Sequence, residues 1–278
     1  MKTEANNPAW RILSGTQVKI LGVALMAAYY THKFFSSGIN ALAPAWLGMI
    51  GQAYPALFLF TASEGLFYTH SRKRYVIQLL IGYEIMNLLN VLASSVMLSE
   101  IMLFDNAFGT LFFMSVYVIL IDRLKEELKE GNRRRIATAV LLLAVPVLIS
   151  AVSIVFQEFI ALLTRGLSIT SLSILMVAIL AVPNLFLVDG GIAMVGLGVI
   201  FYCARNWRFV QIAVIVSLSI ASFAIGDGWR WMMVFAAVPI FLYNGKRGAE
   251  IKHFFYIYYP ALVYALYFLA WFLPKLGH

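Results

Sequence analysis

The chain has 278 residues, of which 62% are hydrophobic and only 12% are charged. A soluble domain carries about twice that charged fraction, so the composition excludes an ordinary soluble fold. The net charge of +8 indicates cytoplasmic loops and contact with anionic lipid or ligands, not nucleic-acid binding. The single cysteine, Cys203, excludes an intramolecular disulfide and a cysteine-based metal site.

Apolar runs of about 15 to 25 residues recur along the chain and predict an all-α, polytopic membrane protein. The run at 191–204 is short and rich in glycine, which is typical of a broken or re-entrant piece inside a helix bundle. We expect about ten transmembrane helices in one membrane-embedded domain over residues 1–278. The runs cover residues 18–35, 46–68, 75–98, 107–121, 136–156, 167–188, 191–204, 209–226, 231–243 and 251–273.

Clusters of basic residues predict the orientation of the first half of the chain. The loop at 72–74 and the charged segment at 122–135 lie on the same side if each run between them crosses. Basic loops favour the cytoplasm, so we expect the N-terminus in the cytoplasm and the protein in the inner membrane. Residues 122–135 then form a structured cytoplasmic loop between two halves. Arg205 and Arg208 do not fit the alternation, so either one intervening run does not span or the rule fails there.

A short basic turn between two glycines follows the run at 231–243, with the sequence Tyr243-Asn244-Gly245-Lys246-Arg247-Gly248. Gly245 and Gly248 permit positive φ, so the chain can reverse there and leave backbone N–H groups pointing outward. One interpretation is a helix-hairpin turn that its charges anchor at the cytoplasmic face. The other is a cradle for a phosphate-bearing ligand, where N–H groups and cations meet at a helix start.

His32 lies within the first apolar run, where an ionisable side chain is costly and therefore a candidate for function. It follows about fourteen residues of the run, roughly 20 Å from the cytoplasmic boundary. A neutral imidazole there can act as a general base. The alternative is a histidine at the outer headgroup level, beside Lys33 and the tyrosines at 29 and 30.

Carboxylates and amides in the second and third runs form a further group of candidates. Glu64 lies nearer the cytoplasm than His32, and we expect it to pair with Tyr68 or with a basic loop residue. Glu84, Asn87 and Asn90 share one arc of the third helix, so this polar stripe should face the bundle interior. It indicates either hydrogen bonding between helices or the wall of a polar cavity. The sequence has no phosphate-binding Walker loop, zinc cluster or hydrolase serine motif.

The turn at 243–248 and the later Phe254-Phe255-Tyr256-Ile257-Tyr258-Tyr259-Pro260 together resemble the TraX family. Those are multispanning proteins named for the acetylase of the N-terminal amine of conjugative pilin. Residues 64–75 and the first run with its His32 also resemble that family, and Asn106 and the turn at 189–191 match more loosely. Three positions depart from the family pattern. Thr31 replaces an aspartate, Gln78 an arginine, and Ala261-Leu262-Val263 stands where a histidine is expected.

The resemblance implies a membrane-embedded acyltransferase that transfers an acetyl group from acetyl-CoA, without a metal. The acceptor would be an amine or hydroxyl of a membrane-associated or exported molecule, such as a pilin-like protein N-terminus. His32 would take a proton from the attacking group, and Asn106 or a tyrosine would stabilise the oxyanion. The implied cofactor-binding residues are Asn244, Lys246, Arg247, Arg72, Lys73 and Arg74, and the implied substrate-binding residues are Glu64, Glu84, Asn87 and Tyr259.

Two other functions stay open. The missing aspartate and histidine favour a catalytically inactive assembly factor for a pilus or secretion system. Many spans with buried carboxylates also suit a small-molecule transporter or flippase, although no inverted repeat is visible in the sequence.

Overall fold

The structure is a computed structural model that describes residues 10–36, 42–97, 106–163, 182–249 and 254–276. Helices form most of these residues, and within these ranges the only extended pairing is an isolated parallel bridge between Leu13 and Tyr243. The predicted all-α class is therefore confirmed. The chain divides into two compact units, one of residues 1–65 and 200–278 and the other of residues 66–199.

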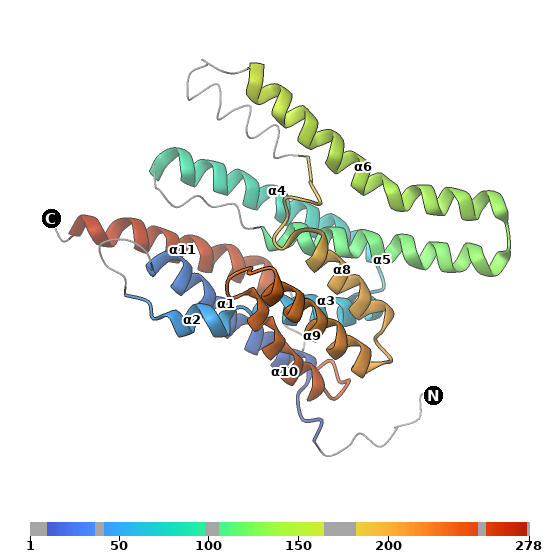
Figure 1. Ribbon diagram of the computed structural model, residues 1–278, viewed down its shortest axis with the longest axis horizontal. Helices are drawn as coiled ribbons and strands as arrows, with labels where there is room; N and C mark the ends of the chain where they lie inside the picture. Colours follow the sequence, from blue (N-terminus) through green and yellow to red (C-terminus); the bar gives the residue numbers. More distant parts are fainter. Residues whose placement is uncertain (1–9, 37–41, 98–105, 164–181, 250–253, 277–278) are drawn as a thin grey trace. The chain divides into compact units, whose positions relative to one another are not determined.

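The first unit is built around α1 (Gly15–Phe35), which packs against α2 and α11. A second group of helices forms where η1 and α10 pack against α9, and α2 also contacts η1 (Figure 1). Residues up to 65 of α3 and the last residues of α8 belong to this unit as well. The further elements are α2 (Ala45–Gly51), α3 (Tyr54–Tyr68), α8 (Gly191–Cys203), α9 (Arg208–Ala224), η1 (Arg230–Ala236), α10 (Ala237–Phe241) and α11 (Phe254–Leu276).

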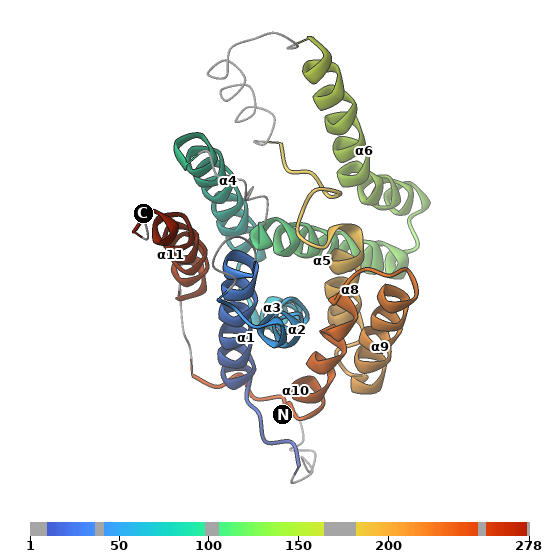
Figure 2. The same ribbon diagram turned by 60° about the vertical axis from the view of Figure 1, so that its left-hand side comes forward.

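The start of α1 is fixed by a capping box and by the segment that follows α10. The Ser14 amide donates to Gln17 Oε1 at 2.7 Å, and the Gln17 amide donates to Ser14 Oγ at 3.4 Å. This reciprocal pair satisfies two backbone donors at the helix start. The segment after α10 passes the start of α1 (Figure 2), where the Leu13 amide donates to the Leu242 carbonyl at 3.0 Å.

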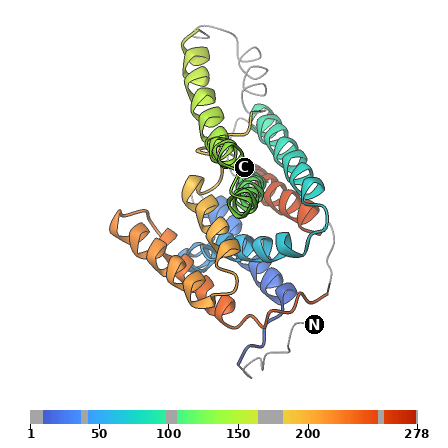
Figure 3. The same ribbon diagram turned by 90° about the vertical axis from the view of Figure 1, so that its right-hand side faces the viewer.

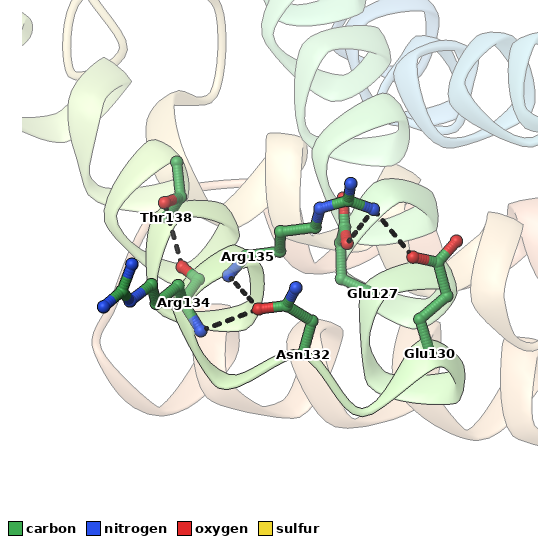
Figure 4. A network of polar contacts seen from close by, with 6 residues as sticks. All are labelled: Glu127, Glu130, Asn132, Arg134, Arg135 and Thr138. Carbon is green, nitrogen blue, oxygen red and sulfur yellow. Dashed lines mark hydrogen bonds and ion pairs between the residues drawn. The ribbon is translucent and has the colours of Figure 1, made fainter.

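The second unit contains α4 (Arg72–Met97), α5 (Ala107–Glu130) and α6 (Arg133–Leu163), in which α5 packs against both of the others. The charged segment at 122–135 forms the end of α5, a turn at Gly131 with φ of 73°, and the start of α6. Arg135 lies 2.8 Å from Glu130 and 3.9 Å from Glu127, which fastens this turn (Figure 4). Pro146 lies inside α6, which is drawn as one long yellow-green helix in Figure 3.

Five helical stretches among the described residues are long and apolar enough to cross a membrane. They cover Ala45–Tyr68, Arg72–Ala93, Ala107–Glu130, Arg133–Ile160 and Phe254–Leu273. Helices α8 and α9 and the stretch Arg230–Phe241 are apolar but shorter. The predicted run at 167–188 lies largely outside the described residues. The helices are thus compatible with an all-α membrane protein, and about ten crossings stay a prediction.

Candidate functional site

His32 lies near the end of α1 in a tight contact with α2. A Cβ atom at Gly48 would overlap the His32 ring, so glycine is what allows the imidazole to lie there. On another side, the ring of Trp229 lies 5.2 Å from the imidazole, centroid to centroid. The Nδ1 atom of His32 is buried and has no hydrogen-bond partner among the described residues. A positioned ring nitrogen without a protein partner is what a general base requires.

Tyr30 lies on a different face of α1 from His32, since residues two apart on a helix do not face each other. On its own face Tyr30 meets Tyr259 of α11. Their hydroxyl oxygens are 3.4 Å apart, and both side chains are buried. One turn further along, the rings of Phe34 and Tyr267 are 5.7 Å apart. Val263 is buried between Tyr259 and Tyr267 on the same face of α11. The position of the expected histidine therefore adjoins this aromatic contact.

The basic turn predicted at 243–248 forms against the start of α1. Gly245 and Gly248 have φ of 77° and 76°, as predicted. The Gly15 amide donates to the Lys246 carbonyl at 2.8 Å, and the Thr16 amide donates to the Arg247 carbonyl at 3.1 Å. Carbonyl groups of the turn thus accept hydrogen bonds from the amides of Gly15 and Thr16 at the start of α1. These two amides are therefore not available to bind a phosphate group.

The side chains of the turn remain suited to an anion. Lys246 and Arg247 are exposed. Asn244 shapes the turn, because its Oδ1 accepts the Lys246 amide at 2.9 Å. At about 1.5 Å of rise per residue, α1 places His32 roughly 25 Å from Gly15 and hence from this turn. The two predicted ends of the site, the basic turn and the imidazole, therefore lie at opposite ends of one helix.

Glu64 lies in a polar centre that the sequence did not predict. Its carboxylate accepts a hydrogen bond from Tyr243 and interacts electrostatically with Arg208 and Arg205. Its basic partners therefore come from residues 205 and 208, and not from the loop at 72–74. The guanidinium carbon of Arg208 lies 5.0 Å from the ring centroids of both Phe60 and Tyr243.

Gln211 fixes Arg208 from within its own helix. Arg208 Nη1 donates to Gln211 Oε1 at 2.7 Å, and Gln211 Nε2 donates to the Phe201 carbonyl at 2.7 Å. Gln211 is fully buried, so this relay joins the guanidinium to the backbone of α8. The sequence carried one signal of this centre, because Arg205 and Arg208 broke the predicted alternation of basic loops.

Asn106 lies in the second unit and precedes α5. Its Nδ2 donates to the Tyr83 carbonyl at 2.9 Å and to Asn87 Oδ1 at 2.8 Å. Both amide hydrogens thus have protein acceptors, so an oxyanion would have to displace one of them. Asn87 and Asn90 are buried, which confirms that this face of the third predicted helix points inward. Glu84 is half-buried on the same helix.

Arg72, Lys73 and Arg74 also belong to the second unit, at the start of α4. Arg72 Nη1 donates to Asp122 Oδ2 at 2.6 Å, which joins α4 to α5. Lys73 and Arg74 are exposed. In the described part of the chain, no three His, Cys, Asp or Glu side chains gather closely enough to hold a metal ion.

Comparisons of the chain with protein-family models, with curated proteins and with solved structures find no match. The class of the protein therefore rests on its fold and its apolar helices. It is an all-α protein with helices long and apolar enough to cross a membrane.

Proposed function

We propose that the chain is a membrane-embedded acyltransferase that moves an acetyl group from acetyl-CoA to an amine or hydroxyl acceptor. The observation that supports this most is His32, whose buried Nδ1 has no partner among the described residues and whose ring is held by Gly48 and Trp229. A base placed in this way, on a helix whose start contacts a cationic turn, suits a reaction with an anionic donor.

The proposed reaction is a single acyl transfer. The acceptor nitrogen or oxygen attacks the thioester carbonyl, and His32 takes the proton that the acceptor loses. The bond between the carbonyl carbon and the new atom forms, the carbon–sulfur bond breaks, and the thiolate leaves. His32 then returns the proton to the sulfur. Donors near the carbonyl would stabilise the oxyanion, and a tyrosine hydroxyl is the kind of group that we propose for this role.

The donor enters this scheme from the cytoplasm, with its phosphate groups at Lys246 and Arg247. Their side chains are exposed at the start of α1, and the turn carbonyls that cap α1 fix the backbone beneath them. We further propose about ten crossings of the inner membrane with the N-terminus in the cytoplasm, because basic residues cluster at 72–74 and 122–135 and basic loops favour the cytoplasm. His32 then lies in the outer half, within reach of an exported acceptor.

The experiment uses the purified full chain, acetyl-CoA labelled in the acetyl group, and a membrane extract as the source of acceptor. The proposal predicts incorporation of label that Lys246→Ala strongly reduces. Lys129→Ala is the matched control, because Lys129 is an exposed lysine at the end of α5 and its loss should leave incorporation unchanged. Absence of both binding and incorporation in the wild type would contradict the proposal.

An inactive assembly factor is the second candidate, and specific residues favour it. Thr31 stands where the resembling family has an aspartate, and Ala261-Leu262-Val263 stands where it has a histidine. If those groups are required for proton transfer, the chain would bind the donor and transfer nothing. Binding of acetyl-CoA without incorporation of label would favour this candidate.

A further inference from the structure

Two arginines of the first unit interact with one carboxylate, and a third arginine interacts with one of them. Arg208 interacts electrostatically with Glu64 and with Arg11, and Glu64 interacts with Arg205 as well. All three arginines are half-buried, so they are partly desolvated and still reachable from solvent. Arg208 and Arg11 therefore lie close enough to repel each other. Like charges gathered in this way are unfavourable unless an anion accompanies them.

Two of these guanidinium groups also have buried donors to spare. Arg208 Nε and Arg11 Nε are both buried, and neither has an acceptor among the residues that the structure describes. A buried donor without an acceptor is unfavourable, and more so when it belongs to a charged group. The repulsion between Arg11 and Arg208 and their unused Nε donors both point to an acceptor with negative charge.

The neighbouring residues hold these groups in place. The Arg208 guanidinium carbon lies 5.0 Å from the ring centroids of both Phe60 and Tyr243, and Gln211 fixes its Nη1. The Arg11 guanidinium carbon lies 4.9 Å from the ring centroid of Trp10, which stacks on Phe241. Groups that are already oriented lose little entropy when they bind a ligand.

A phosphate group matches this arrangement best. Guanidinium groups bind phosphate oxygens through paired N–H donors, and a phosphate monoester carries a charge of about −1.5 to −2 at neutral pH. Tyr243 pairs with Leu13, and the turn with Lys246 and Arg247 follows directly in the chain. The arginines therefore extend the same cationic end of the first unit.

We propose that Arg11, Arg205 and Arg208 form a binding site for the phosphate group of a ligand. If the ligand is the acyl donor, the site binds a phosphate group of coenzyme A. This form of the proposal rests on the function proposed above. An anionic lipid headgroup offers the same chemistry, so the two sources are distinguished by experiment.

The test measures binding of two probes to the purified full chain: coenzyme A in solution, and phosphatidylglycerol vesicles compared with phosphatidylcholine vesicles. The variants are Arg11→Gln and Arg208→Gln. The matched control is Arg134→Gln, an exposed arginine whose side chain points away from its neighbours in Figure 4. The site predicts that each variant weakens binding of one probe by about tenfold or more, while the control does not. Binding should also weaken with rising salt.

The outcomes separate the site from the proposed function. Coenzyme A binding that both variants weaken supports both. If coenzyme A binds the wild type and neither variant changes the binding of either probe, the site is overturned and the acyltransferase is left intact. If coenzyme A does not bind the wild type but phosphatidylglycerol binds through Arg11 and Arg208, the site stands and the acyltransferase fails. The site is also overturned if Arg11→Gln and Arg208→Gln bind each probe as the wild type does. If Arg208→Gln does not fold, Arg11→Gln decides the result. The Nε donor that Arg11→Gln removes has no acceptor among the described residues.

Discussion

The guanidinium of Arg208 lies against the ring of Tyr243, 5.0 Å from its centroid, while the hydroxyl of Tyr243 donates to Glu64. One aromatic side chain thus contacts both members of a charged pair. Through its bridge to Leu13, the same residue joins this pair to the start of α1. The stability of the first unit and the position of the basic turn therefore depend on this contact.

Removal of either charge of this pair should destabilise the protein, and removal of both should cost less than the sum. Arg208→Gln loses hydrogen bonds of a charged group, worth about 1–3 kcal/mol, and leaves Glu64 with weaker compensation. Glu64→Gln leaves the arginines without their carboxylate. Thermal unfolding of the two single variants and the double variant measures the coupling. Strict additivity of the three values would contradict the pairing.

Gly48→Ala should lower both the melting temperature and acetyl transfer. The new Cβ atom overlaps the His32 ring, and such overpacking costs about 1–3 kcal/mol, more than the gain in helix propensity. Gly196→Ala is the control, because no atom lies within 4 Å of its Cβ position in α8. It should leave unfolding unchanged or slightly stabilised. Equal melting temperatures for the two variants would argue against the tight contact of His32 with α2.

The two glycines of the basic turn should respond differently to alanine. Both have positive φ, so each substitution costs about 1–2 kcal/mol of backbone strain. Only at Gly248 does the new Cβ atom also collide with α1, since it would lie 2.7 Å from Thr16 Oγ1, whereas nothing lies within 4 Å at Gly245. Thermal unfolding should therefore show a larger loss for Gly248→Ala. The reverse order would mean that the turn does not rest on α1.

Asn106→Asp should be more damaging than Asn106→Ala. The amide nitrogen donates to two acceptors, the Tyr83 carbonyl and Asn87 Oδ1. An ionised aspartate has only acceptors, so it would oppose these oxygens with a buried negative charge. The difference is measured as the loss of folded protein in detergent on heating. Full stability of Asn106→Asp would show that this amide does not bridge the two groups.

Local features of the fold could be predicted from the sequence because they depend on neighbouring residues. The helical period of the third run placed Asn87 and Asn90 on the buried face, and the glycines at 245 and 248 were expected at positive φ. The segment at 122–135 was expected as a structured loop with a solvated helical end at Glu126 and Glu130, and α5 does extend to Glu130 while α6 begins at Arg133. Its alternating charges stabilise a solvated helix as readily as they suit a loop.

The polar centre around Arg208 could not be predicted, because its members are far apart in the chain. Arg11, Glu64, Arg208 and Tyr243 come from four separate segments, and no periodic pattern connects them. Glu64 was expected to pair locally with Tyr68, whereas the fold brings it to the start of α9. The failure of Arg205 and Arg208 to fit the alternation of basic loops was the one local sign that these cations have another role.

Acetyl transfer by the His32→Ala variant tests the central claim most directly. The measurement compares label incorporated from acetyl-CoA by the variant and the wild type, with coenzyme A binding measured on the same preparations. We predict that His32→Ala binds coenzyme A as the wild type does and transfers at least about a hundredfold more slowly, as expected when a general base is lost. Transfer at the wild-type rate would contradict the assignment of His32 as the base.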